Sequence, residues 1–257
     1  MLSTFIYNLK GSDDVRYLMT FSYDGTLFSG YQVQKGKRTV EEEIEKVLTK
    51  INHNEKIKIY ASGRTDAHVH ALNQKAHFDF EKYDVDILKD KINKMLPKDI
   101  YIKKIEEVEN NFHARYHEKK KEYVYKINTL EYNPFEVNYI YQYNKKLNVE
   151  KMKEAITYFI GEHDFTSFTS SKGKKEDMKR TIYNASIQEN DGILEISFIG
   201  NGFLQYMVRN MVGLLIDIGE EKKEPIEVKN ILDLKNRIYA SKTFSPVGLY
   251  LKDVIYI

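Results

Sequence analysis

The chain has 257 residues, 42% of them hydrophobic and 30% charged, a composition typical of a soluble globular protein. It contains no cysteine, which excludes disulfides, thiolate metal sites and cysteine nucleophiles and favours the reducing cytoplasm as its location. The formal net charge is only +2. No apolar run approaches the roughly 18 residues of a membrane span, so we expect no membrane segment.

The first part of the chain predicts the order strand, helix, strand, strand, helix, strand. Apolar residues recur at helical spacing after Thr39, and Glu42 three residues later indicates a capping box. Alternating apolar residues and the Asp24-Gly25 turn signal mark the strands. The predicted strands are Arg16–Tyr23, Lys56–Ala61, Lys75–Phe80 and Ile100–Val108, and the predicted helices are Thr39–Ile51 and Val85–Leu96.

The second part of the chain repeats this order. Asn148 is placed to cap a helix, Asn190-Asp191-Gly192 indicates a hairpin turn, and Pro225 suits the first turn of a further helix. The predicted strands are Glu122–Asn128, Thr181–Gln188, Ile193–Ile199 and Lys252–Ile257, and the predicted helices are Val149–Ile160, Phe203–Ile218 and one after Pro225.

The repeated order predicts an α+β fold built from two ferredoxin-like (βαββαβ) halves. We expect an N-terminal half over residues 1–110 and a C-terminal half over residues 111–257, each with its own antiparallel-rich sheet. A central basic cleft between the halves is the expected place for a functional site.

The connector Ser62–Asn73 is long for a link between two neighbouring strands, and such connectors in compact domains often carry function. Its ionisable side chains are Arg64, Asp66, His68 and His70. Three interpretations stay open. Asp66 is a nucleophile, or it caps a turn in an ordinary polar loop, or it binds a metal with these histidines and His77.

The segment Phe112–Ile127, FHARYHEKKKEYVYKI, combines Arg115 and the run Lys119–Lys121 with Tyr123 and Tyr125 on one face of a strand. Rings that stack on bases and cations that hold phosphates are typical of nucleic-acid binding. The alternative is that this face points to the core, with both tyrosines buried and their hydroxyls hydrogen-bonded.

A second basic run follows in the C-terminal half. It consists of Lys172, Lys174, Lys175, Lys179 and Arg180. Local runs of this kind can neutralise phosphates even when the total charge is near zero. A solvated, lysine-rich surface explains them equally well.

The segment Gly200–Gly213, GNGFLQYMVRNMVG, is apolar on most sides of its predicted helix, so we expect it to be buried. Arg209 lies inside this run and needs an anionic partner, because an unpaired buried charge is costly. The pair is either a structural salt bridge or one in which Arg209 keeps a working carboxylate ionised.

Taken together, these segments resemble the TruA-type tRNA pseudouridine synthases over most of the chain. Five blocks in the family's order carry the resemblance: FSYDGTLFSGYQVQKGKRTVEEEIEKVL (Phe21–Leu48), SGRTDAHVHALNQKAHF (Ser62–Phe78), FHARYHEKKKEYVYKI (Phe112–Ile127), GEHDFTSF (Gly161–Phe168) and GNGFLQYMVRNMVG (Gly200–Gly213). The resemblance implies isomerisation of uridine to pseudouridine in the anticodon arm of tRNA, at positions 38 to 40. It also implies a homodimer that needs no cofactor or metal.

The resemblance further implies roles for four residues. Asp66 matches the family's essential aspartate, and Arg209 matches the arginine that is paired with it. Tyr123 matches the tyrosine that packs on the target base. Arg64 matches an arginine that holds the place of the flipped nucleotide or its phosphate.

One position departs from the family pattern. After the aspartate the family usually reads Asp-Ala-Gly-Val-His, whereas this chain reads Asp66-Ala67-His68-Val69-His70. Glycine gives backbone freedom and lets RNA approach closely, so His68 leaves the RNA target open. The alternatives are a divergent paralogue that acts on another tRNA site or on ribosomal RNA, and an inactive RNA-binding module.

Overall fold

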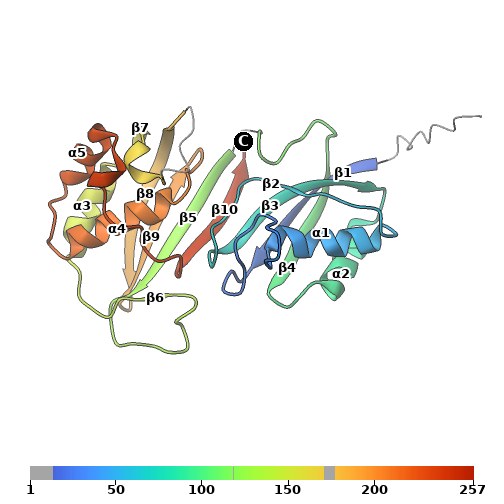
Figure 1. Cartoon of the computed structure of the whole chain (residues 1–257), viewed down its shortest axis with the longest axis horizontal. Coiled ribbons are helices and arrows are strands. Elements are labelled where there is room, and N and C mark those ends of the chain that lie inside the picture. The colour runs from blue at the N-terminus through green and yellow to red at the C-terminus, as the bar shows by residue number, and fades with distance from the viewer. Residues whose placement is uncertain (1–13, 118, 171–176) are drawn as a thin grey trace, which may run out of the picture.

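The computed structural model of the chain describes residues 14–117, 119–170 and 177–257 (Figure 1). Its strands, in chain order, are β1 (Asp14–Tyr23), β2 (Tyr60–Ala61), β3 (His70–Glu81), β4 (Ile100–Val108), β5 (Lys119–Asn128), β6 (Tyr141–Gln142), β7 (Gly161–Asp164), β8 (Lys179–Asn190), β9 (Ile193–Gly200) and β10 (Leu249–Tyr256). Its helices are α1 (Val40–Ile51), α2 (Val85–Met95), α3 (Val149–Thr157), α4 (Met207–Gly219) and α5 (Glu227–Leu234), with 3-10 turns η1 (Thr166–Phe168) and η3 (Arg237–Tyr239).

The strands join into one ten-stranded sheet in the order β4-β1-β3-β10-β5-β9-β8-β7, with β2 beside β3 and β6 beside β5. Neighbours are antiparallel except in the β3–β10 and β5–β6 pairs. The expectation of a separate sheet in each half is therefore wrong. Both edges of β10 carry backbone hydrogen-bonding groups, and β10 pairs with β3 on one side and with β5 on the other.

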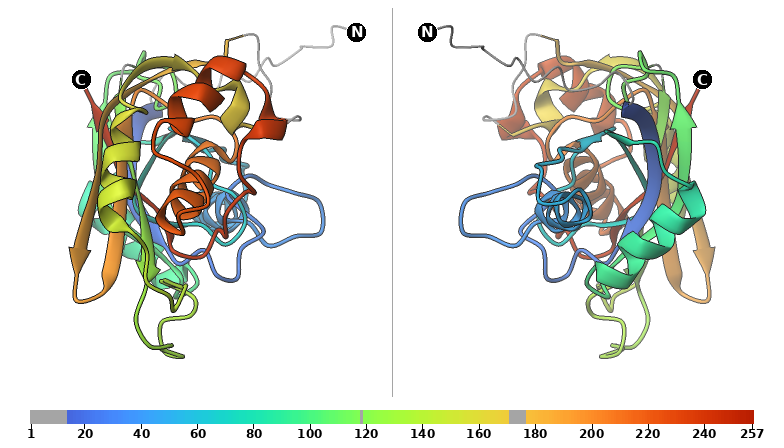
Figure 2. Two further views of the ribbon diagram at one scale, coloured as in Figure 1. Left: turned by 90° about the vertical axis from the view of Figure 1, so that its left-hand side faces the viewer. Right: turned by 90° about the vertical axis from the view of Figure 1, so that its right-hand side faces the viewer.

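Figure 2 shows α1, α4 and α5 on the same side of this sheet. The apolar stripe predicted for α1 is buried, as is almost all of α4. α4 begins at Met207, later than the predicted Phe203, because Tyr206 has a left-handed φ of 64° that a helix cannot contain. Among the described residues, no helix combines the length and apolar character that a membrane crossing needs.

The predicted strand Lys56–Ala61 pairs with β3 only at its last two residues. Side chains of α1 take the backbone groups that an extended strand would use. The N–H of Ile57 donates to Thr49 Oγ1 at 3.1 Å, and the N–H of Ile59 donates to Glu45 Oε1 at 3.1 Å. The segment is thus tied to the helix and not to the sheet.

The two predicted helix caps have different outcomes. Asn148 caps α3 as predicted, because its side chain accepts a hydrogen bond from Lys151 N at 3.1 Å. The capping box at Thr39 is wrong. Thr39 precedes α1, but its hydroxyl is buried and has no hydrogen-bond partner in the described part of the chain.

Candidate active site

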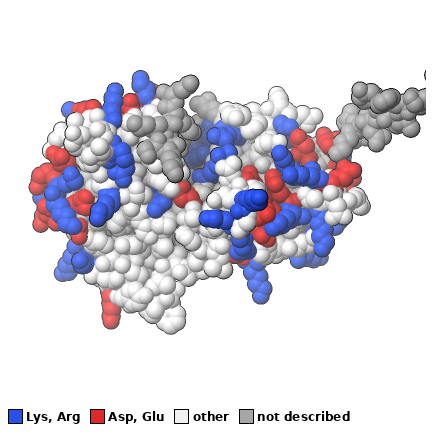
Figure 3. Space-filling model, in the orientation of Figure 1, with Lys and Arg blue, Asp and Glu red and all other residues white. Residues whose placement is uncertain are grey.

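A cleft of about 1380 Å³, lined by loops and by residues of β5, β8 and α4, lies at the N-terminal ends of α1 and α4. The N-terminal part of the chain lines the cleft with residues of segments 29–41 and 59–69. The C-terminal part lines it with residues of segments 113–123, 177–180 and 201–209. Figure 3 shows Lys and Arg side chains around this recess. The described charged residues of the lining are eight basic ones, Lys37, Arg64, Arg115, Lys119, Lys121, Lys179, Arg180 and Arg209, and three acidic ones, Glu41, Asp66 and Asp177.

The loop that carries Asp66 rests on the segment between β1 and α1. The backbone N–H of His68 donates to Phe28 O at 3.3 Å. Gly25 approaches so closely that a Cβ at this position would overlap the carbonyl oxygen of Val69. The motifs did not predict that Gly25 helps to fix Asp66, although the Asp-Gly turn signal marks the place.

Asp66 and Arg209, 143 residues apart in the sequence, form an ion pair with 3.0 Å between Oδ2 and Nη1. Nε of Arg209 donates to Phe244 O at 2.8 Å, and the guanidinium lies 5.0 Å from the ring centroid of Tyr206. The side chains of Arg209 and Asp66 are 14% and 24% exposed. Within the described part of the chain, Oδ1 of Asp66 is left without a hydrogen bond.

Two opposing effects set the pKa of the Asp66 carboxyl. Burial raises this pKa because the charged form loses solvation, whereas the hydrogen bond and the charge of Arg209 lower it. Burial has the larger effect, so the pKa of Asp66 lies above the ordinary value of an aspartate. Arg209 therefore limits a rise in pKa that burial causes.

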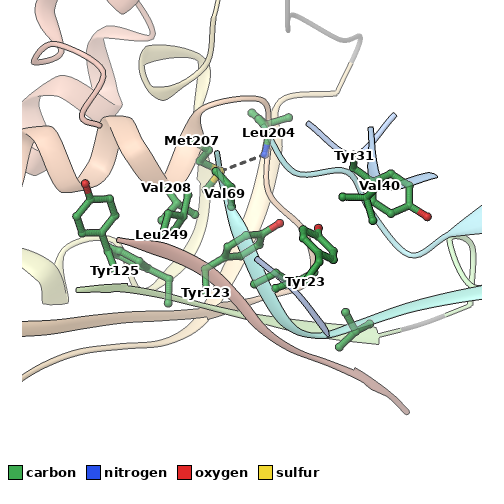
Figure 4. Packing of buried hydrophobic residues seen from close by; sticks show 14 of the residues in the cluster. Tyr23, Tyr31, Val40, Val69, Tyr123, Tyr125, Leu204, Met207, Val208 and Leu249 are labelled. Carbon is green, nitrogen blue, oxygen red and sulfur yellow. Dashed lines mark hydrogen bonds between the residues drawn. The ribbon is translucent and has the colours of Figure 1, made fainter. Parts of the chain in front are cut away.

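Tyr123 lies in β5 and borders the cleft, although only 8% of it is exposed. Its ring meets Phe203 edge-on with 5.0 Å between the ring centroids. Burial raises the pKa of the Tyr123 hydroxyl, so this ring stays uncharged at neutral pH. Figure 4 shows Tyr123 beside Tyr23, with Tyr125 pointing away from both. Tyr125 does not border the cleft, and its hydroxyl donates to Ser245 O at 2.8 Å.

Arg64 also borders the cleft, where its side chain is exposed. Within the described residues it donates no hydrogen bond and forms no ion pair. A guanidinium without a protein partner is available to a phosphate or a carbonyl group of a ligand. The structure thus brings the four predicted site residues to one cleft: Asp66, Tyr123, Arg64 and Arg209.

Among the described residues, no group of three or more His, Asp or Glu side chains is placed to bind a metal ion, and the histidines considered as partners of Asp66 have other contacts. Nδ1 of His70 accepts from Gly25 N at 3.1 Å, and its Nε2 donates to Asn138 O at 2.9 Å. Nδ1 of His77 accepts from Ala114 N at 3.2 Å. Burial lowers the pKa of His70 and lowers that of His77 to about 4, so both are neutral structural histidines.

The backbone conformation at His68 is one that favours glycine, the usual residue in the family pattern at this position. His68 has a φ of 65°, in the left-handed region that glycine enters most readily. Its exposed ring turns back on the segment before α1, with Nδ1 donating to Thr26 O at 2.8 Å. A hydrogen bond thus offsets part of the backbone strain at this position.

The structure divides the first basic run, Lys119–Lys121. Lys119 and Lys121 border the cleft, and Lys121 Nζ donates to Ser62 O at 2.9 Å. Lys120 lies on the other face of β5, with Nζ 5.2 Å from the ring centroid of Tyr183. From the second run, Lys179 and Arg180 border the cleft, and Lys172, Lys174 and Lys175 lie outside the described residues.

Comparison with known proteins gives consistent matches along the chain. A family model described as tRNA pseudouridine synthase matches residues 19–117 and 155–257. The chain is 46% identical to tRNA pseudouridine synthase A of Geobacillus sp., over 94% of this chain and 98% of that protein. It is 44% identical to tRNA pseudouridine synthase A 1 of Bacillus cereus and to tRNA pseudouridine synthase A of Lactococcus lactis, over 94% of this chain and 98% and 97% of those proteins. The chain therefore belongs to the tRNA pseudouridine synthase family, a family of isomerases that act on uridine in tRNA.

Proposed function

We propose that this enzyme converts uridine to pseudouridine in the anticodon arm of tRNA, at positions 38 to 40, with Asp66 as the nucleophile. The observation that carries this proposal is the ion pair of Asp66 and Arg209, with 3.0 Å between Oδ2 and Nη1, in a cleft large enough for a nucleotide. Family membership supports tRNA as the substrate. Positions 38 to 40 rest on the resemblance to the TruA-type enzymes.

The reaction needs a group that can start cleavage of the glycosidic bond and then let the uracil and the ribose rejoin through a different atom of the base. The bond between N1 and C1′ breaks, the uracil turns, and C5 joins C1′. A proton leaves C5 and N1 gains one, so the atoms balance. A carboxylate can begin this sequence by attacking a carbon or by removing a proton from the ribose. Because Arg209 binds Oδ2 of Asp66, we assign the first step to Oδ1.

A uridine must leave its base stack before it can reach Asp66. The edge-on rings of Tyr123 and Phe203 offer the extruded uracil an apolar surface. Arg64, two residues from Asp66, is suited to fill the vacated place in the RNA or to hold a phosphate. The detached uracil has to stay in the site while it turns, which requires that bound RNA excludes water from the cleft.

The charge of the lining supports a basic, RNA-binding cleft. Eight Lys or Arg residues border the cleft against three Asp or Glu residues among the described positions. Lys and Arg that neutralise phosphates release counterions, so such binding weakens as salt rises. We assign this role to the lysines and arginines that surround the Asp66–Arg209 pair.

The division into halves at residues 1–110 and 111–257 is part of this proposal. The strand orders β4-β1-β3-β2 and β10-β5-β9-β8 repeat one pattern, in which the fourth, first, third and second strands of a βαββαβ unit follow each other. This repeat supports two ferredoxin-like halves that share one sheet. Asp66 and Arg64 would belong to the first half, and Tyr123 and Arg209 to the second.

The enzyme is further proposed to work in the cytoplasm as a homodimer, without a metal or a cofactor. The homodimer rests on the resemblance to the TruA-type enzymes, and the cytoplasm on the lack of cysteine. The reaction is an isomerisation, so it transfers no electrons and needs no group from a second substrate. The side chains of the cleft supply a nucleophile, a cation beside it and stacking rings.

Release of tritium from C5-labelled uridine in unmodified tRNA tests the proposal. We expect the wild-type enzyme to release tritium and Asp66→Ala to lose more than ~10³-fold in rate. Asp177→Ala is a matched control from the same cleft, since Asp177 accepts from Lys179 N at 2.8 Å. It should keep the wild-type rate at saturating tRNA.

The outcomes separate the parts of the proposal. Mapping of the product to a position outside 38 to 40 would contradict the assigned site. No release from any tRNA would favour ribosomal RNA as substrate or an inactive RNA-binding module. Release by Asp66→Ala at the wild-type rate would contradict the role of Asp66 but leave the proposed activity on tRNA intact.

A further inference from the structure

The segment Phe112–His117, between β4 and β5, brings a group of rings to the wall of the cleft. The ring centroids of His113 and Tyr116 lie 4.4 Å apart with 36° between the planes. Tyr60 stacks on His77 at 5.0 Å and 21°, and lies 5.9 Å from His113. Tyr60, His113 and Tyr116, which we name the ring platform, all border the same cleft as Asp66.

Two rings of the platform are open to solvent. Tyr116 is 76% exposed and Tyr60 is 48% exposed, so neither contributes its full surface to the core. The proposed reaction does not use them, because Tyr123 already supplies the ring beside Asp66. A flat ring with a free face in a basic cleft is the kind of surface on which an unpaired base stacks.

Side chains from three strands hold the segment beneath the platform. Arg16 of β1 donates to Phe112 O at 2.8 Å, and the hydroxyl of Tyr256 of β10 donates to Ala114 O at 2.8 Å. The N–H of Ala114 donates to Nδ1 of His77 of β3 at 3.2 Å. A surface that is fixed before binding loses less conformational entropy when a ligand arrives.

The positive charges lie on residues that flank the ring platform, whereas the rings themselves are uncharged. The guanidinium of Arg115 lies 6.0 Å from the ring centroid of Tyr116, and Lys119 borders the same cleft. Burial lowers the pKa of His113 and lowers that of His77 to about 4, so both imidazoles are neutral near pH 7. The rings therefore offer stacking surfaces, and the flanking cations offer contacts for phosphate.

We propose that the ring platform binds a second nucleobase of the RNA, one that stays unpaired while a neighbouring uridine reacts at Asp66. This base stacks on Tyr116, and Arg115 contacts the adjoining phosphate. The inference rests on the proposed function, because the loop of an anticodon arm supplies unpaired bases close to positions 38 to 40.

The test places 2-aminopurine at each unpaired position of an anticodon-arm RNA in turn, because its fluorescence falls when it stacks on a ring. We expect wild-type enzyme to quench it at one position or at two neighbouring ones. Tyr116→Ala should lose this quench and bind the RNA about 5- to 150-fold more weakly, the range for loss of one base–aromatic stack. Tyr116→Phe keeps the flat ring and should match the wild type. Tyr101→Ala is the control, since Tyr101 is 56% exposed but does not border the cleft.

Turnover separates the platform from the reaction. At saturating RNA, Tyr116→Ala should release tritium at the wild-type rate, because the base on Tyr116 is not the base that reacts. Suppose that wild-type enzyme binds and modifies the RNA. If Tyr116→Ala then leaves the quench and the affinity unchanged, or lowers the rate at saturating RNA, the ring platform is overturned and the proposed function stands. If wild-type enzyme neither binds nor modifies the anticodon arm, the proposed function is overturned and the platform with it.

Discussion

Arg209 has two effects on Asp66: it fixes one carboxylate oxygen, and it limits the rise in pKa that burial causes. The proposed reaction needs the ionised carboxylate. Activity is therefore present above the pKa of Asp66 in the folded enzyme and is lost as the pH falls through that pKa. Because the pKa is raised, the loss begins at a higher pH than for an exposed aspartate, whose pKa is about 3.9.

Arg209→Met should move the acid limb of the kcat/KM profile to higher pH, because only burial then acts on the pKa of Asp66. We expect at least a ~10-fold loss of activity at neutral pH. Arg209→Lys keeps the positive charge but loses the planar guanidinium, so its acid limb and its activity should lie between those of the wild type and Arg209→Met. Initial rates across the acidic and neutral range measure the limb. An acid limb that does not move in Arg209→Met would contradict this role.

The backbone at His68 gives a second prediction. Its φ of 65° costs a residue other than glycine roughly 1–2 kcal/mol, and the bond from Nδ1 to Thr26 O offsets part of this cost. His68→Ala loses the bond and keeps the strain, whereas His68→Gly loses both. Urea unfolding should therefore find His68→Gly more stable than His68→Ala by about 1 kcal/mol. Equal stabilities would show that the backbone is not strained.

On the scale of elements, the orientation of Arg209 depends on a close contact between α4 and the segment Lys242–Phe244. The contact is made at Gly213, one turn after Arg209 along the helix. A Cβ at Gly213 would overlap the carbonyl oxygen of Lys242. The same segment supplies Phe244 O to Nε of Arg209, and Phe244 N donates to Arg209 O at 3.2 Å. Gly213 therefore sets the spacing between α4 and the segment that aims Arg209 at Asp66.

Gly213→Ala should push this segment away from α4. We expect a loss of about 1–3 kcal/mol in the free energy of unfolding and a lower kcat, because Arg209 shifts with the segment. Gly219→Ala is the matched control on the same helix, where a Cβ would crowd the side chain of Met152. It should cost stability without a change in kcat. A normal kcat in Gly213→Ala would contradict the link between this contact and the site.

Elements with strong local signals could be predicted from the sequence. Apolar spacing located α1, and the Asn190-Asp191-Gly192 turn located the hairpin of β8 and β9. Prediction failed where contacts from elsewhere in the chain take over. The hydroxyl of Thr39 is buried without a hydrogen-bond partner in the described part of the chain, and α1 side chains bind the N–H groups of Ile57 and Ile59. No local pattern contains these contacts.

Across the whole molecule, the pleat of β5 sorts neighbouring lysines to opposite faces of the sheet. If the cleft holds tRNA, Lys119→Ala should weaken tRNA binding and reduce the slope of log affinity against log salt by about 1. Lys120→Ala removes the same charge one residue away, but its Nζ lies over Tyr183, so both quantities should stay unchanged. Binding titrations at several salt concentrations measure the slopes. Equal effects of the two variants would contradict the cleft as the RNA site.

The four proposed site residues were predicted from motifs and a family resemblance, yet their assembly into one cleft depends on the strand order. The sequence predicted an α+β repeat but not the single sheet, because β10 has the same alternation of side chains whether it lies at an edge or in the centre. Which lysine of Lys119–Lys121 faces the cleft also depends on pairing partners. Motifs name the chemical groups, and long-range pairing decides where they point.

The pairing of β3 with β10 has a consequence for the order of events in folding. Tyr250 pairs with His70, and Asn73 Nδ2 donates to Lys252 O, 179 residues further along the chain. Contacts over such separations form slowly, whereas helices form within microseconds. A refolding chain should therefore regain its helical circular-dichroism signal well before it can modify tRNA. Partly folded chains in which β3 and β10 have not yet paired should lack an assembled cleft and therefore be inactive.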